Sequence, residues 1–318
     1  MLDNNFFKLN SSFSIKGLLI LILLWSETSM FAQQDAQYTQ YMYNTVSVNP
    51  GYAGSRGQIS IAALHRSQWL GLEGAPTTQT FNIHSPIGYR GLGLGLSIVN
   101  DKIGPTSETN FDVDFSYTLT LAAESRLSFG LKASANLLDI RFSELNQFIT
   151  DQTLQQDIDN RLSPNVGAGV YYHTDKFYAG LSVPRILETS YFEESSLSTA
   201  KEQMNFYFIT GYVWDLNPML KFKPTLLTKV VQGAPLQVDL SANFMLNERF
   251  ILGAAYRWDA AFSGMVGFNV NGNFLIGIAY DRETTELGNA AFNDGSFEVI
   301  LRYDFISSKN NLKSPRFF

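Results

Sequence analysis

The stretch Ser296-Phe297-Glu298-Val299-Ile300-Leu301-Arg302-Tyr303-Asp304-Phe305 alternates between two kinds of side chain. The odd-numbered positions are all apolar or aromatic, and the even-numbered ones are polar or charged apart from Ile300. A strand points successive side chains to opposite faces, so one face is apolar. A soluble sandwich could bury that face, but about ten residues ending in an aromatic one suit an outer-membrane strand. We therefore predict an apolar lipid face opposite the lumen-facing candidates Glu298, Arg302 and Asp304.

A second stretch, residues 109–121, repeats this alternation. Apolar side chains from Phe111 to Leu121 occupy every second position, and Asp112 and Asp114 lie between them. Two aspartates buried in a soluble strand would be costly, whereas a wet lumen accepts them at little cost. We therefore add Asp112 and Asp114 to the lumen-facing candidates.

The composition fits such a barrel. Charged residues make up 16% of the 318-residue chain, below the roughly 25% of soluble domains, while Phe, Tyr and Gly are frequent. The chain has no cysteine, which excludes disulfides, thiolate metal sites and a lipoprotein anchor. The net charge is −6 without a basic cluster, so we expect no nucleic-acid partner.

The first 32 residues read as a signal peptide. Lys8 and Lys16 precede the apolar run 17–25, and small and polar residues follow to Ala32. We expect cleavage before Gln33, although Met30 is larger than the residue usual at that position, which leaves the cut site open. An uncleaved anchor helix is the alternative, but the run is too short to span a bilayer.

The segment 33–57 is rich in Tyr, Asn and Gln and contains the turn signal Asn49-Pro50-Gly51. It is either a periplasmic lead-in that packs its tyrosines under the barrel, or a plug or docking surface. Tyr combines contact area with a hydrogen-bonding tip, which suits a contact surface. The partner-binding candidates are Tyr38, Gln40, Tyr41, Asn44, Asn49, Pro50 and Tyr52.

The remaining chain predicts an all-β fold, a transmembrane antiparallel up-and-down β-barrel of about 14 strands over residues 58–306, with a periplasmic tail at 307–318. The expected strands are 58–67, 77–87, 91–100, 109–121, 126–138, 164–173, 177–184, 203–214, 220–230, 236–246, 249–258, 262–270, 273–281 and 296–306. The first strand should close on the last. Glycines within strands, as in the weak repeat around Gly130, Gly180, Gly253 and Gly277, should allow bending.

The connections alternate in length. The short ones are 88–90, 122–125, 174–176, 215–219, 247–248 and 271–272. The generally longer ones are 68–76, 101–108, 139–163, 185–202, 231–235, 259–261 and 282–295. Outer-membrane barrels keep short turns in the periplasm, so we expect the longer connections outside and both termini in the periplasm. Residues 143–160 have helical spacing, which predicts one helix on the outer side.

Catalytic chemistry is largely missing. The histidines are His65, His84 and His173, and the adjacent pair His84-Ser85 would point to opposite strand faces. Gly91–Gly95 lacks the spacing of a dinucleotide loop, and the acidic residues lack metal-ligand spacing. We expect no catalytic, cofactor-binding or metal-binding residues, and no enzyme.

Several motifs occur in order along the chain: Gln33–Asn44, Asn49–Ser55, Arg66-Ser67-Gln68-Trp69, Gly74-Ala75-Pro76 and Lys313–Phe318. Together they resemble the PorP/SprF family of Bacteroidetes over essentially the whole mature chain. The family usually has Pro where Ala36 stands and Ala where Gly51 stands, and neither difference threatens the resemblance.

The resemblance implies an outer-membrane component of the type IX secretion system. Its implied partners are outer-membrane lipid, the secretion machinery or its periplasmic ring, and a secreted surface protein. That cargo would be a gliding adhesin or a protein with a type-B sorting domain. The resemblance does not separate core components from cargo-dedicated ones. Because fold does not fix function, a small-molecule porin or a plugged transporter of fatty-acid type is the alternative.

Overall fold

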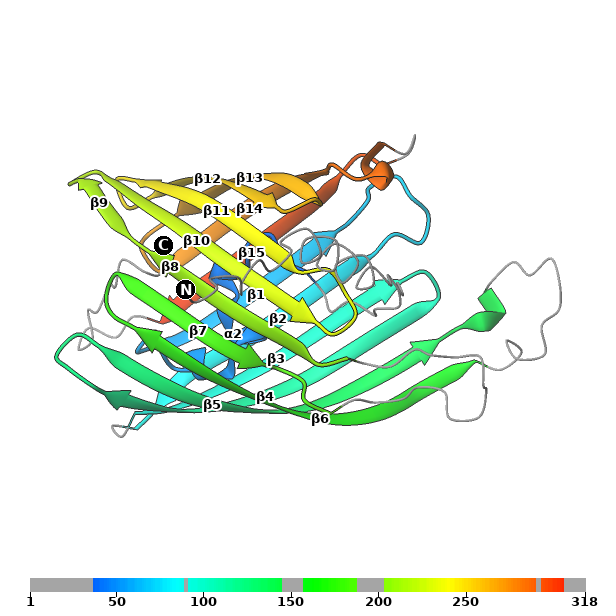
Figure 1. Ribbon diagram of the computed structural model, residues 1–318, viewed down its shortest axis with the longest axis horizontal. Coiled ribbons are helices and arrows are strands. Elements are labelled where there is room, and N and C mark those ends of the chain that lie inside the picture. The colour runs from blue at the N-terminus through cyan, green and yellow to red at the C-terminus, as the bar shows by residue number, and fades with distance from the viewer. Residues whose placement is uncertain (1–36, 89–90, 145–156, 188–202, 290–292, 306–318) are drawn as a thin grey trace, which may run out of the picture.

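The protein forms one closed antiparallel sheet (Figure 1). The computed structural model describes residues 37–88, 91–144, 157–187, 203–289 and 293–305. The strands are β1 (Ile59–Ser67), β2 (Thr77–Ile87), β3 (Leu92–Ile103), β4 (Thr106–Thr120), β5 (Arg126–Ile140), β6 (Ile158–His173), β7 (Phe177–Val183), β8 (Asn205–Tyr212), β9 (Trp214–Asn217), β10 (Leu220–Val231), β11 (Gln237–Leu246), β12 (Phe250–Arg257), β13 (Ala261–Asn269), β14 (Phe274–Glu283) and β15 (Ser296–Phe305). Because β8 and β9 pair with the same strand and are separated only by Val213, they count as one interrupted strand. The barrel therefore has fourteen strands, as predicted.

The barrel closes between its first and last strands. β1 pairs with β15 from Ile59↔Phe305 to Ser67↔Phe297 without a shift in register. The predicted closing pair is thus confirmed. Each strand pairs with its sequence neighbours on both sides, which is the up-and-down order expected from the alternating connections.

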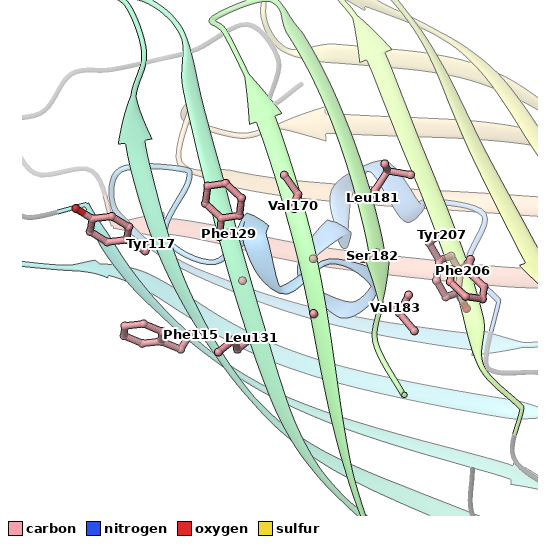
Figure 2. A pocket seen from close by; sticks show the side chains of 13 residues that line it. Phe115, Tyr117, Phe129, Leu131, Val170, Leu181, Ser182, Val183, Phe206 and Tyr207 are labelled. Carbon is pink, nitrogen blue, oxygen red and sulfur yellow. The ribbon is translucent and has the colours of Figure 1, made fainter. Parts of the chain in front are cut away.

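The two faces of the wall differ as the alternation predicts. In β15 the even-numbered side chains from Ser296 to Asp304 are buried, and Phe297, Leu301 and Tyr303 are exposed on the outside. Figure 2 shows side chains of β4–β8, most of them outward-facing, around a shallow apolar groove of about 640 Å³, with the N-terminal segment behind the wall. This outer surface is the apolar face that a lipid environment requires.

A row of aromatic side chains marks one end of the outer surface. Tyr212, Trp214, Phe222 and Phe244 follow one another along β8, β9, β10 and β11 with ring centroids 4.7–5.8 Å apart. The row continues with Phe250, Phe268, Phe274, Tyr303 and Phe305. These rings lie where β8 and β9, β11, β13 and β15 end and the next strands begin, as in the aromatic girdles of outer-membrane barrels.

The connections leave the barrel at two ends. We call the end of the barrel at which β1, β5, β7 and β14 end the long-connection end, and the opposite one the short-turn end. The expected loop at 101–108 was wrong, because β3 and β4 continue to Gly104-Pro105 and meet in a tight turn. Their polar residues had suggested a loop.

The predicted helix at 143–160 is wrong for the residues of this range that the structure describes. Residues 145–156 lie outside the described residues. Phe142–Glu144 form one 3₁₀ turn, η3, and Ile158–Asn160 already belong to β6. Within the described part of the chain, no helix has the length and apolar character needed to cross a membrane.

The N-terminal segment, residues 37–58, lies inside the barrel. It contains three short helical turns, η1 (Tyr41–Tyr43), α2 (Thr45–Val48) and η2 (Pro50–Tyr52), all of them buried (Figure 1). Gln37 bonds to Gln237, the first residue of β11, at the long-connection end. The segment then descends through the lumen to β1 at the short-turn end.

Candidate functional site in the barrel lumen

The closing strand binds the N-terminal segment through a buried carboxylate. The two oxygens of Glu298 on β15 accept the backbone N–H groups of Thr39 and Gln40, each at 2.9 Å. The Glu298 side chain has no solvent exposure. A buried carboxylate is stabilised when backbone N–H groups point at it, so this contact fixes the segment to the seam of the barrel.

A buried arginine joins the same carboxylate to the neighbouring strands. Arg66 on β1 lies 2.6 Å from Asp281 on β14 and 3.2 Å from Glu298. It also donates to the Thr39 hydroxyl, which itself donates to Asp281. Buried charges are tolerated when they are paired and hydrogen-bonded, and here the segment supplies part of that pairing.

A second set of charged and basic side chains joins the segment to the wall farther from Glu298. Arg56 forms a bidentate ion pair with Asp304 near the end of β15, with N–O distances of 3.0 and 2.6 Å. Tyr43 lies close to two basic side chains: Lys223 Nζ is 5.0 Å and the Arg302 guanidinium 5.6 Å from its ring centroid. Such cation–π contacts offset part of the cost of burying the charges.

Asn49 connects the segment to the opposite wall. Its Nδ2 donates to the carbonyl oxygens of Val170 on β6 and Leu181 on β7, at 3.1 and 3.4 Å. Its Oδ1 accepts the backbone N–H of Gly51 at 2.9 Å, which caps η2. One fully buried side chain thus holds both the turn and the wall.

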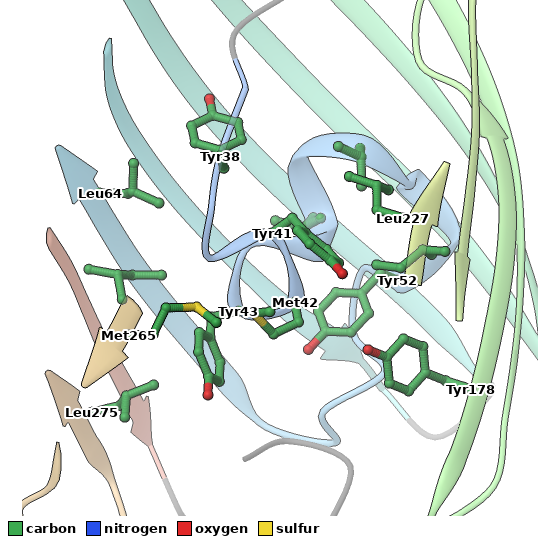
Figure 3. Packing of buried hydrophobic residues seen from close by; sticks show 14 of the residues in the cluster. Tyr38, Tyr41, Met42, Tyr43, Tyr52, Leu64, Tyr178, Leu227, Met265 and Leu275 are labelled. Atoms are coloured by element: carbon green, nitrogen blue, oxygen red, sulfur yellow. The ribbon is translucent and has the colours of Figure 1, made fainter. Parts of the chain in front are cut away.

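The tyrosines pack against the wall and bond to it (Figure 3). The hydroxyl of Tyr38 lies 2.8 Å from the Thr80 hydroxyl on β2, and that of Tyr41 lies 2.7 Å from Thr225 on β10. The Tyr52 ring makes an edge contact with Tyr171 on β6. These tyrosines form the core of the lumen together with residues such as Leu64, Leu227, Met265 and Leu275.

Inward-facing glycines make room for this segment. A Cβ on Gly130 would lie 2.2 Å from the Gly51 nitrogen, and one on Gly277 would lie 2.4 Å from Oε1 of Gln40. Gly169 and Gly180 face Asn49 in the same way. Any larger residue would collide with the segment, so close approach explains these strand glycines.

The five lumen-facing candidates all lie on the inner side of the wall. Their expected wet environment is wrong, because Asp112, Asp114, Glu298, Arg302 and Asp304 are all buried. Lys132 on β5 approaches Asp112 at 3.1 Å and Asp114 at 3.2 Å. The cost of these buried charges is met by ion pairing rather than by bulk water.

The seven partner-binding candidates are buried within the segment, and most of them contact the wall directly. Direct contact with a partner stays a prediction, and it would require access to the lumen. The sequence interpretation missed Arg56, Arg66, Lys132, Lys223 and Asp281, which carry the charged contacts. Four of them lie at inward-facing positions of strands. The alternation of side chains along each strand could have identified them as lumen residues.

The direction of the segment also differs from the expectation. A periplasmic lead-in would enter at the short-turn end, whereas Gln37 lies at the long-connection end and Arg56 at the short-turn end. Residues 37–56 therefore span the lumen before β1 begins. The physical reason is the pairing: Glu298 and Asp304, at the two ends of β15, bind the two ends of the segment.

The family model for the type IX secretion system membrane protein PorP/SprF matches residues 30–303. The chain belongs to the PorP/SprF family. The motif resemblance is thereby confirmed, and this PorP/SprF protein is a type IX secretion membrane protein with an outer-membrane barrel fold. A comparison with curated proteins found no significant match.

The chain is similar to solved outer-membrane proteins at very low identity. The outer-membrane protein Omp33 of Acinetobacter baumannii is 8% identical, with 78% of this chain and 98% of that chain covered and a TM-score of 0.47. The toluene transporter TbuX of Ralstonia pickettii is 9% identical, with 84% and 93% covered and a TM-score of 0.48. We draw no functional conclusion from either.

Proposed function

We propose that this PorP/SprF protein assists the secretion or surface anchoring of one partner protein, and that it does so as a closed platform. The observation that supports the proposal is the filled lumen. The N-terminal segment bonds to strands from β1 round to β15, including β2, β6, β10 and β14. A segment held on all sides blocks a conduit and leaves the outer surfaces for function.

The partner is a secreted surface protein of the class that the family serves: a gliding adhesin or a protein with a type-B sorting domain. We place the long-connection end outside the cell and the C-terminal end of β15 in the periplasm, following the rule for short periplasmic turns. The partner then meets the long-connection end after export, and machinery or ring components meet the short-turn end.

The porin alternative requires an open path. Opening one here would expose the buried pairs of Arg66 and Arg56, and breaking one such pair typically costs about 3–5 kcal/mol. A small solute that moves through the barrel makes too few contacts to offset the cost of breaking these ion pairs. The filled lumen therefore favours the platform.

Two measurements test this proposal together. The full-length protein is captured from its native outer membrane and its partners are identified by mass spectrometry. We expect a large secreted protein with a C-terminal sorting domain. In planar bilayers, we expect no steady conductance from the purified protein. A stable open channel without any captured protein would overturn the proposal in favour of the porin.

A further inference from the structure

A polar pocket of about 330 Å³ lies at the long-connection end of the lumen. Its walls come from the long-connection ends of β1, β2, β3 and β14, from the β12–β13 connection and from Gln37 of the N-terminal segment. Four of its lining residues, Arg66, Gln68, Trp69 and Pro76, belong to the motifs that carry the family resemblance. Apart from the ion pairs of Arg66, the proposed platform function gives these motif residues no role.

The pocket has an excess of negative charge. Arg66 and Arg257 are the two arginines that line it, and each is already paired with a carboxylate. The carboxylates that line the pocket are Asp101, Asp281 and Glu283, while Asp239 and Glu298 pair with the two arginines from outside the lining. Three carboxylates against two guanidinium groups line the pocket itself, and this net negative charge favours a cationic ligand.

Trp69 supports the same chemistry. Its φ of 49° is in the left-handed region, which is rare for a bulky residue and often marks a functional position. Its indole Nε1 donates to a carboxylate oxygen of Glu283. An indole held beside a carboxylate is an arrangement that suits an ammonium or guanidinium group.

Arg66 adds a group that a polypeptide could satisfy. Its side chain is 2% exposed, and its Nε has no hydrogen-bond acceptor among the described residues. A buried donor without an acceptor costs free energy, and a backbone carbonyl oxygen of a bound segment would remove that cost. The pocket thus offers a donor for a main chain beside carboxylates for a basic side chain.

We propose that this pocket binds a lysine or arginine side chain on an extended segment of the secreted partner. The proposal rests on the proposed function, because it needs the long-connection end to face the exported protein. Asp101 and Glu283 contact the basic group, and Arg66 Nε donates to the main chain of the same segment. The pocket thereby selects partner segments with a basic residue.

The test uses the full-length mature protein in detergent with Trp214→Phe and Trp258→Phe, so that Trp69 reports on the pocket. The probe is a capped Gly/Ser peptide with one central Arg, and the matched control peptide carries Glu. We expect saturable quenching by the Arg peptide only. Glu283→Gln should weaken its binding about tenfold or more, the effect of losing one charge-assisted hydrogen bond. Glu248→Gln, an exposed carboxylate at the short-turn end, should leave it unchanged.

Equal responses to the Arg and Glu peptides, or no saturable response, would overturn the pocket proposal. Partner capture from the native membrane separates the two proposals. Capture that survives Glu283→Gln together with Asp101→Asn overturns the pocket and leaves the platform standing. Failure of the unsubstituted protein to capture a partner overturns the platform instead.

Discussion

Arg56 and Asp304 form a bidentate ion pair that joins the N-terminal segment to the closing strand, with N–O distances of 3.0 and 2.6 Å. At the other end of β15, Glu298 accepts backbone N–H groups from Thr39 and Gln40. The strand that closes the barrel is therefore held by the lumen segment at both ends. We therefore expect closure of the wall and seating of the segment to be coupled.

This coupling predicts a large effect of Arg56→Gln. The substitution leaves the buried Asp304 carboxylate without its bidentate partner, and such a loss typically destabilises by about 3–5 kcal/mol. We expect the folded band in a heat-modifiable gel to be lost at a clearly lower temperature.

The matched control is Lys176→Gln. Lys176 pairs with Asp215 at 2.7 Å, and the hydrogen bond to Asp215 raises the pKa of Lys176, but both side chains are exposed. Exposed pairs contribute little to stability. A gel shift as large as that of Arg56→Gln would mean that burial does not set the strength of these pairs.

The inward glycines give a steric prediction. Gly130→Ala places a Cβ 2.2 Å from the backbone nitrogen of Gly51, so the segment must move or the wall must bend. We expect a lower unfolding temperature and faster proteolysis of the N-terminal segment. Gly264→Ala, on another strand with open space around its Cβ, is the control and should behave like the unsubstituted protein. Identical behaviour of the two variants would contradict the close approach.

The two faces of β4 should respond differently to substitution. Phe115 is exposed on the outer face, so Phe115→Arg should destabilise by about 2–4 kcal/mol in the bilayer, whereas Phe115→Leu should be mild. Asp114→Asn would be mild in a wet lumen, but the ion pair with Lys132 predicts a clear loss of stability. Unfolding in lipid vesicles measures both, and a neutral Asp114→Asn would contradict the buried pair.

Local pattern was sufficient to predict the wall. The alternation in residues 296–305 predicted which side chains of β15 face outward, because the two-residue period of a strand needs no knowledge of the neighbouring strands. The same alternation did not predict the strand residues Asp101–Ile103 and Thr106–Glu108, because the strands carry polar residues there and the pattern is lost. Strand length at that end depends on pairing with the next strand, which the local sequence does not contain.

The lumen could not be predicted in the same way. Thr39 depends on Asp281 and Glu298, and Asn49 on Val170 and Leu181, and all of these partners are more than 100 residues away in the chain. No local period connects such pairs. The Tyr-rich composition indicated a contact surface, but the surface that these residues contact is the protein's own wall.

The central claim is that the protein functions with its lumen segment in place. The natural chain has no cysteine, and a Cβ on Gly51 would lie 3.2 Å from that of Tyr171. This separation is slightly shorter than the roughly 3.5–4.5 Å between the Cβ atoms of a disulfide, so a small outward shift of the segment would allow the bond. The measurement is surface display of the captured partner in cells carrying Gly51→Cys with Tyr171→Cys, with and without reductant, against each single substitution. We predict equal display whether the segment is locked or released. Display that is lost in the locked state and restored by reduction would contradict the account, because the segment would then have to move for function.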